Sequence, residues 1–191
     1  MPRKINNSNK AILPNKPVDN STMTQTLYLL RHAKAEPWMP GINDFARKLS
    51  ERGLEHMHHL SRWALASLSE PEVVLCSSSN RTRETLEPFF KTWTDLPSHT
   101  NYMDEIYEGS TGTLHSMAEK FFERSETVMM IGHNPGFEHL ATSLMRDQDS
   151  AQISKMATGT LAVIEFPAGY EIDCGEGVLR EWITRRNLSF D

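Results

Sequence analysis

Short runs of apolar residues alternate along this chain with longer segments in which apolar residues recur at helical spacing. A run of about four to eight apolar or β-branched residues is typical of a strand buried on both faces. We predict such strands at residues 26–30, 73–76, 127–131 and 160–166. Two further strands are expected near residues 170–174 and 178–185, after a turn at Pro167–Gly169.

The longer segments predict amphipathic helices. They cover residues 50–68, 80–93, 110–124 and 135–146. In the first, Leu54, Met57 and Leu60 lie on one face. Pro88 should interrupt or bend the second, whereas Pro135 is acceptable in the first turn of the last.

Strand followed by helix, repeated three times, predicts a single α/β domain. Helices on both faces of a mostly parallel central sheet would give a three-layer αβα sandwich. The last two strands should add antiparallel edge strands to this sheet.

Composition narrows the function classes. The 191 residues suit one domain with or without a tail, and 38% apolar residues suffice for a core. With 20 basic against 25 acidic residues the net charge is −5, so we expect neither nucleic-acid nor membrane binding. No apolar run approaches the ~20 residues of a membrane-spanning helix. Two cysteines suit a reducing compartment, and we expect a cytoplasmic location.

Residues 1–24 differ from the rest of the chain. Residues 1–22 hold four basic residues and one acidic residue, a charge of +3, which leaves −8 for the remainder. Their apolar cluster, Ala11–Leu13, is too short for a secretory signal, and the prolines disfavour the amphipathic helix of a transit peptide. We therefore predict a disordered leader at 1–24, with Met23 as an alternative start, and a domain at 25–191.

Three predicted strands end abruptly in polar residues. These segments are Arg31-His32, Ser77 to Arg81, and Gly132 to Gly136. Residues just beyond the carboxyl ends of parallel strands meet in one crevice, which would here hold two histidines and two arginines. Guanidinium forks match phosphate oxygens, and the amides at helix N-termini add to the positive field. The sequence therefore predicts a phosphate pocket.

The same segments resemble the signature of the histidine phosphatase superfamily. The matching motifs are Leu29-Leu30-Arg31-His32-Ala33, Ser77-x-x-x-Arg81-x-x-x-Thr85 and Gly132-His133-Asn134-Pro135. The similarity is closer to the short branch, the phosphohistidine phosphatases of the SixA type. That branch also matches Asp44-x-x-Arg47-x-Leu49-Ser50-x-x-Gly53, Ile106-Tyr107 and Thr158-Gly159-Thr160. The resemblance covers roughly residues 27–166 and implies a phosphoglycerate mutase-like fold.

The resemblance also implies roles for the crevice residues. His32 would be the nucleophile, Arg31, Arg81 and His133 would complete the phosphate pocket, and Asn134 would contact substrate. A neutral imidazole can attack phosphorus, giving a phosphohistidine intermediate that water then hydrolyses. Because nearby positive charges lower a histidine pKa, His32 should be neutral near neutral pH. This scheme requires neither metal nor cofactor.

The proton donor is less well marked. Longer relatives protonate an alcohol leaving group with a carboxylate, and Asp104, Glu105 and Glu108 lie in the corresponding stretch. We take Glu105 as the candidate. A leaving imidazole has a reference pKa of ~6.5 and departs far more readily than an alkoxide. The weak donor signal therefore favours phosphoramidate substrates.

Other candidate residues have simpler interpretations. Cysteine phosphatases carry an arginine six positions after the cysteine, but Thr82 stands there relative to Cys76, which we interpret as a buried strand end. His56, His58 and His59 should lie on a solvated helix face rather than in a metal site. Trp38 fits a substrate-facing wall or a loop anchor equally well.

The leading hypothesis is thus a metal-independent phosphatase acting through a phosphohistidine on His32. Its substrate would be a phosphorylated protein, because the short chain between Arg81 and His133 should leave the pocket open. The alternatives are a phosphatase of a small phosphorylated metabolite and a non-catalytic phosphate-binding module. A phosphomutase would need a site closed to water, for which the sequence offers no lid.

Overall fold

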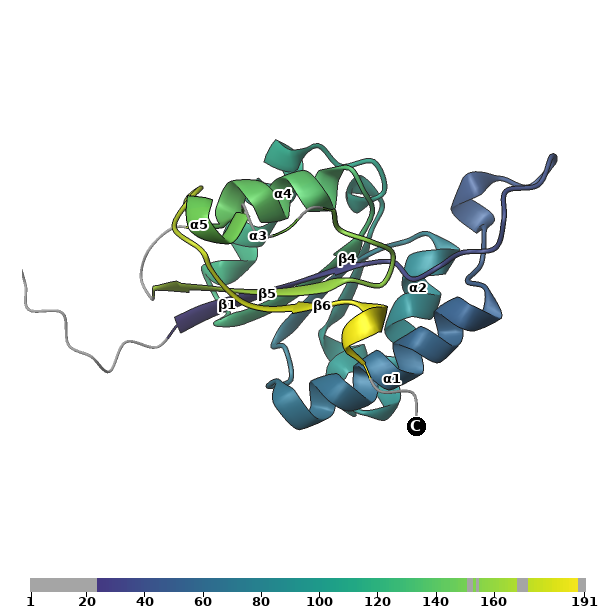
Figure 1. Cartoon of the computed structure of the whole chain (residues 1–191), viewed down its shortest axis with the longest axis horizontal. Helices are drawn as coiled ribbons and strands as arrows, with labels where there is room; N and C mark the ends of the chain where they lie inside the picture. The colour runs from purple at the N-terminus through teal and green to yellow at the C-terminus, as the bar shows by residue number, and fades with distance from the viewer. Residues whose placement is uncertain (1–23, 151–152, 154, 168–171, 189–191) are drawn as a thin grey trace, which may run out of the picture.

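A computed structural model of the chain describes residues 24–150, 153, 155–167 and 172–188 (Figure 1). Its six-stranded sheet has the order β3-β2-β4-β1-β5-β6. The strands are β1 (Thr24–Arg31), β2 (Val73–Ser77), β3 (Thr100–Met103), β4 (Thr127–Gly132), β5 (Leu161–Pro167) and β6 (Val178–Ile183). β1, β2, β3 and β4 pair in parallel, while β5 is antiparallel to both of its neighbours. The predicted mostly parallel sheet is confirmed.

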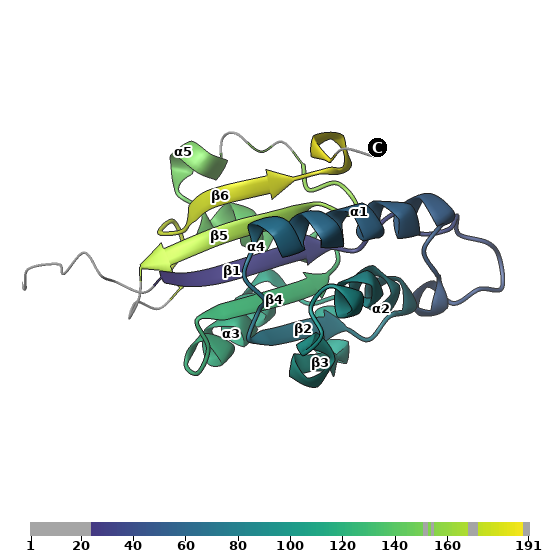
Figure 2. The same ribbon diagram turned by 90° about the horizontal axis from the view of Figure 1, so that it is seen from below.

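Helices cover both faces of this sheet. One face carries α1 (Glu51–Ser67) and α2 (Asn80–Leu86), and the other α3 (Thr111–Phe122), α4 (Gly136–Leu144) and the short α5 (Asp147–Ser150). Figure 1 shows the three layers edge-on, and Figure 2 shows α1 and α2 lying across the sheet. The predicted αβα sandwich is therefore confirmed.

The apolar strands fill a core on each face. Leu27 and Leu29 of β1 join the cluster under α3 and α4, whereas Tyr28 and Leu30 join the cluster under α1 and α2. This follows from the alternation of side chains along a strand. A strand buried on both faces must be apolar on both, which is the pattern of residues 27–30 in β1 and 128–131 in β4.

Two predicted elements differ in the structure. The helix expected at 80–93 ends as an α-helix at Leu86 and continues as a 3-10 turn, Glu87–Lys91, because Pro88 cannot donate a backbone hydrogen bond. The strand expected at 170–174 is wrong for its described part, residues 172–174, which form no strand. The carbonyl of Ile172 instead accepts a hydrogen bond from Nε2 of His115 on α3, at 2.6 Å.

Residues 1–23 lie outside the described part of the chain, so the leader stays a prediction. Thr24, which we assigned to the leader, is the first residue of β1 and pairs with Pro167. No helix among the described residues is both long enough and apolar enough to cross a membrane.

The three histidines of α1 do not share one environment. His58 is exposed as predicted, but His56 is only 3% exposed and packs against Gly159. The prediction of a solvated histidine face is therefore wrong for His56. Within the described ranges, no group of three His, Cys, Asp or Glu side chains is placed to hold a metal ion.

Candidate active site

The carboxyl ends of β1, β2 and β4 bring the predicted crevice residues together. Arg31 and Gly132 are partners in the parallel pairing of β1 and β4, and the amide of His32 donates to the carbonyl of Gly132 at 3.0 Å. His32 and His133 follow these positions, and their ring centroids lie 5.1 Å apart. Because neighbouring parallel strands end at one edge, their polar extensions converge.

His32 is held as a neutral imidazole with one nitrogen available. The side chain is 7% exposed, and its Nδ1 lies 2.8 Å from the carbonyl of Ala33. A carbonyl only accepts, so Nδ1 carries the proton and the lone pair is on Nε2. Burial, together with the positive charges of Arg81, Arg31 and Arg47, lowers the pKa of His32 to about 4.

His133 is fixed by two serines that follow β2. Its Nε2 lies 3.0 Å from Oγ of Ser77 and 3.4 Å from Oγ of Ser79. These two hydroxyls orient the ring, and each of them can donate to Nε2 or accept from it. Burial, the neighbouring His32 and Arg81 lower the pKa of His133 to about 3. Its buried Nδ1 has no hydrogen-bond partner among the described residues.

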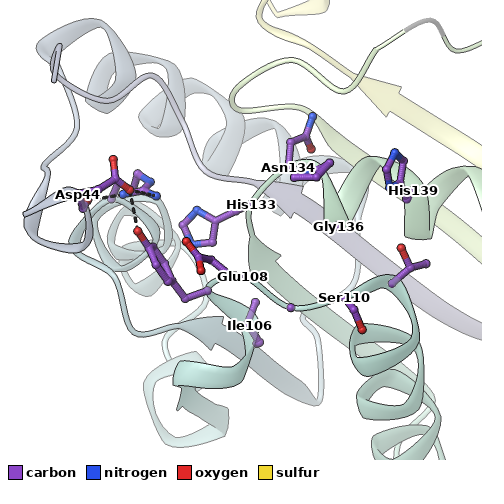
Figure 3. A pocket seen from close by; sticks show the side chains of 13 residues that line it. Asp44, Ile106, Glu108, Ser110, His133, Asn134, Gly136 and His139 are labelled. Carbon is purple, nitrogen blue, oxygen red and sulfur yellow. Dashed lines mark hydrogen bonds and ion pairs between the residues drawn. The ribbon is translucent and has the colours of Figure 1, made fainter.

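The guanidinium of Arg81 is bound to the Asp44 carboxylate. The guanidinium is 5% exposed and donates to the Asp44 carbonyl at 2.6 Å and to Asp44 Oδ2 at 2.9 Å. Tyr107 donates its hydroxyl to the same Oδ2 at 2.7 Å, the contact seen beside Asp44 in Figure 3. The hydrogen bond from Tyr107 and the charges of Arg81 and Arg47 hold the pKa of Asp44 below its usual value. Asp44 is therefore an anion at neutral pH.

Arg31 and Asn134 anchor the segment that precedes β5. Nη1 of Arg31 donates to the carbonyl of Met156 at 2.6 Å, and Nδ2 of Asn134 donates to the same carbonyl at 3.0 Å. Asn134 also donates to Oε2 of Glu138 at 2.9 Å, and this oxygen accepts from the amide of Met156. Both hydrogen bonds of the Asn134 amide nitrogen go to protein acceptors, although Asn134 also lines the cavity described below, so its contact with substrate stays a prediction. Asn134 thus positions residue 156.

A cavity of about 610 Å³ opens beside His133 (Figure 3). Asp44, Arg81, Tyr107 and His133 line its polar side. Among the candidate proton donors, Glu108 lines the cavity, whereas Glu105 is exposed and is not one of its lining residues. The structure therefore does not bring Glu105 to this pocket, because the 3-10 turn Asp104–Ile106 buries Ile106 and turns Glu105 outward.

The site geometry agrees with the similarity of this sequence to known proteins. Residues 27–146 match the family model of the histidine phosphatase superfamily (branch 1). The chain belongs to the histidine phosphatase superfamily. An uncharacterized protein of Mycobacterium tuberculosis, MT1313, is 31% identical over 154 residues, which cover 78% of this chain and 93% of that protein.

Solved structures agree with this assignment. A chain assigned as the phosphohistidine phosphatase SixA of Agrobacterium tumefaciens is 26% identical, with a TM-score of 0.74. The alignment covers 84% of this chain and 97% of that one. The protein histidine phosphatase SixA in complex with tungstate shares the fold at a TM-score of 0.72 and 21% identity, over 85% of this chain and 99% of that one. The protein is thus a phosphatase with a phosphoglycerate mutase-like fold.

In this histidine phosphatase, Thr85 explains the spacing of the second motif. Its Oγ1 accepts from the amide of Ala33 at 3.0 Å and donates to the carbonyl of Arg81 at 2.6 Å. A residue one helical turn after Arg81 is thereby linked to the chain directly after His32. The contact fixes the strand end that carries the histidine to the helix that carries the arginine.

Arg47, like Asp44 and Tyr107, belongs to the site but received no role from the sequence. Its charge acts on His32, and its Nη2 lies 3.2 Å from Oδ1 of Asp44. The sequence did contain a signal for Arg47, because this residue stands three positions after Asp44 in a motif of the short branch.

Cys76 is fully buried, and burial raises the pKa of its thiol to about 12. A thiol that stays protonated is no rival nucleophile.

Proposed function

We propose that this phosphatase transfers a phosphoryl group from its substrate to Nε2 of His32 and then to water, without a metal ion. The observation that carries the proposal is the hydrogen bond from Nδ1 of His32 to the Ala33 carbonyl. It directs the lone pair of a neutral ring to Nε2 while three arginines surround the imidazole with positive charge.

The reaction divides into two displacements. In the first, the Nε2 lone pair forms a bond to phosphorus as the bond to the leaving group breaks, and the leaving group keeps its electron pair. In the second, a water molecule attacks phosphorus, the P–N bond breaks, and the electrons return to Nε2 while the water proton passes to solvent. Both displacements concentrate charge on the nonbridging oxygens, which Arg31, Arg81 and the ring of His133 are suited to stabilise.

The Asp44 carboxylate marks where these oxygens would sit. It accepts from Arg81, Arg47 and Tyr107, which are the kinds of donor that a phosphoryl group requires. We propose that substrate takes over some of these donors when it binds. Guanidinium groups held in advance by a carboxylate need little reorganisation when a phosphate replaces it.

The proposed substrate is a phosphohistidine on a protein. Asp44 is ionised at neutral pH, so the carboxylate nearest to the arginines cannot act as the proton donor that an alcohol leaving group needs. An imidazole leaving group, with a reference pKa of ~6.5, does not depend on a strong acid. The similarity to chains assigned as phosphohistidine phosphatases supports the same substrate class.

The test compares a phosphohistidine peptide with an aryl phosphate, using wild type and His32→Ala in the presence of EDTA. We expect wild type to prefer the peptide, EDTA to leave its rate unchanged, and the variant to lose turnover of both. Inhibition by EDTA that added metal reverses would contradict the metal-free mechanism. If His32→Ala loses both activities but wild type prefers the aryl phosphate, His32 remains the nucleophile and the phosphohistidine substrate is rejected.

A small phosphorylated metabolite is the second candidate substrate. The cavity continues past His133 to the polar side chains of Ser110, Thr111 and His139, which could bind another polar group of a small molecule. A panel of sugar, nucleotide and organic-acid phosphates tests this option. A metabolite with a higher kcat/KM than the phosphohistidine peptide would favour it.

A further inference from the structure

A second cavity lies beside the nucleophile-bearing loop and is lined by basic residues. It has a volume of about 760 Å³ and is bordered by the start of α1, residues 155–158 and the chain at the end of β6. Figure 1 shows this last segment, in yellow, next to α1. Its charged lining residues are Lys34, Arg52, Lys155, Arg185 and Arg186. We refer to this cavity as the basic groove.

The charge of the groove is opposite to that of the molecule. None of the described residues that line it is Asp or Glu, although the whole chain carries −5. Glu55 on α1 pairs with Arg185 at 3.1 Å, while Lys34, Arg52, Lys155 and Arg186 are exposed. Several exposed cations that share one concave surface repel each other unless an anion lies among them.

A buried histidine with an unused nitrogen also lines the groove. His56 is 3% exposed, and its Nε2 has no hydrogen-bond partner within the described residues. Burial is the main reason that its pKa falls to about 4, so the ring is neutral and adds hydrogen-bonding capacity rather than charge. His56 therefore adds no positive charge to the groove, whose cations are the Lys and Arg side chains.

The groove shares a wall with the active site. Gly159 lies against His56, where a Cβ would come within 2.5 Å of the imidazole, and its φ of +75° suits glycine. Its amide donates to the carbonyl of His32 at 2.9 Å. Lys155 and Ala157 line the groove, while Met156 between them accepts from Arg31 through its carbonyl. One short segment thus separates the groove from Arg31 and His32.

We infer that the basic groove binds an acidic segment of the phosphorylated protein whose phosphoryl group enters the pocket at His32. This inference rests on the proposed function. A ligand anchored at His32 that extends past residues 155–159 would place its neighbouring residues among the five cations. A peptide chain can reach from the pocket to the groove, whereas a small anion occupies one of them.

The first experiment uses two phosphohistidine peptides that differ only in their flanks, one rich in Asp and Glu and the other with Asn and Gln instead. We expect wild type to show a KM about tenfold lower for the acidic peptide, with a similar kcat. Arg52→Glu and Lys155→Glu should each remove most of this difference. Their turnover of an aryl phosphate should not change, because neither residue belongs to the pocket. Lys120→Glu, on α3 at the opposite face of the sheet, is the matched control.

The second experiment measures binding without turnover. His32→Ala is titrated with the unphosphorylated acidic peptide by calorimetry, then combined with Arg52→Glu, Lys155→Glu or Lys120→Glu. We expect the first two substitutions to weaken binding about tenfold, the third to have no effect, and salt to weaken binding throughout. Because no chemistry is involved, this result stands or falls independently of phosphohistidine hydrolysis.

Two outcomes would overturn the inference. Equal binding of the acidic and neutral peptides by His32→Ala would show that the groove does not select carboxylates. If inorganic tripolyphosphate binds more tightly than the acidic peptide, and its binding is lost in the same groove variants, the ligand is a small polyanion instead.

Discussion

The carboxylate of Asp44 lies 2.9 Å from Nη2 of Arg81, the guanidinium that the second family motif carries. A second bond from the same guanidinium, 2.6 Å long, reaches the main-chain carbonyl of Asp44. The backbone contact therefore holds Arg81 in place, while the side-chain contact places a negative charge on it. In the mechanism that we propose, substrate phosphate and the Asp44 carboxylate compete for the same donors.

Asp44→Asn should strengthen the binding of phosphate. The variant removes the competing charge but retains the carbonyl that positions Arg81, so we expect the inhibition constant of inorganic phosphate to fall about three- to tenfold. Competitive inhibition of aryl phosphate turnover measures this constant. Asp104→Asn, in the exposed 3-10 turn, is the control. A constant that rises in Asp44→Asn would mean that the carboxylate orders Arg81 rather than competing with phosphate.

The two active-site histidines should remain neutral in mildly acidic solution. Their pKa values, about 4 for His32 and about 3 for His133, lie below the reference value, so protonation and loss of activity occur only as the pH falls towards these values. We expect their NMR ring signals, assigned with His32→Gln and His133→Gln, to stay constant between about pH 8 and about pH 5.5. A midpoint near ~6.5 for either residue would contradict the account.

Ser77 should hold the ring of His133 in place. Ser77→Ala removes the hydrogen bond at 3.0 Å, so we expect kcat to fall about tenfold and the ¹⁵N signals of His133 to shift. Ser79→Ala, whose contact to the same nitrogen measures 3.4 Å, should have a smaller effect. Equal losses in both variants would indicate a general packing defect.

Glu105 and Glu108, the two glutamates after β3, can be distinguished as proton donors by substitution. Glu108 lines the cavity and Glu105 does not, so Glu108→Gln should slow hydrolysis of an alkyl phosphate, whose leaving group needs a proton, more than Glu105→Gln does. Neither change should affect a phosphohistidine peptide strongly. A large loss in Glu105→Gln alone would restore our original assignment of the donor. The values of kcat for the two substrates, measured in both variants, identify the proton donor.

The fold was largely predictable because its central strands are apolar at nearly every position. The apolar runs in β1, β2, β4 and β5 mark strands buried on both faces, and parallel strand ends converge by geometry alone. β3 escaped prediction because Asn101 and Tyr102 are exposed and the strand pairs only at the edge of the sheet. Local sequence contains no apolar signal for such a strand.

The arrangement around the pocket depends on contacts between distant parts of the chain. Sequence placed His32, His133, Arg31 and Arg81 at converging strand ends, but not the pairing of Asp44 with Arg81, 37 residues apart. This pairing depends on tertiary packing rather than on local pattern. The burial of His56, by contrast, was signalled by the sequence, because His56 stands four residues before Leu60 on the buried face of α1.

The most direct test of the central claim is to trap the phosphoenzyme. Wild type and His32→Ala are mixed rapidly with an aryl phosphate in EDTA, quenched in base, which preserves a phosphohistidine, and examined by peptide mass spectrometry. We predict one phosphoryl group on His32 in wild type and none in the variant. Turnover of the substrate without phosphorylation of His32, or equal turnover in His32→Ala, would contradict this mechanism.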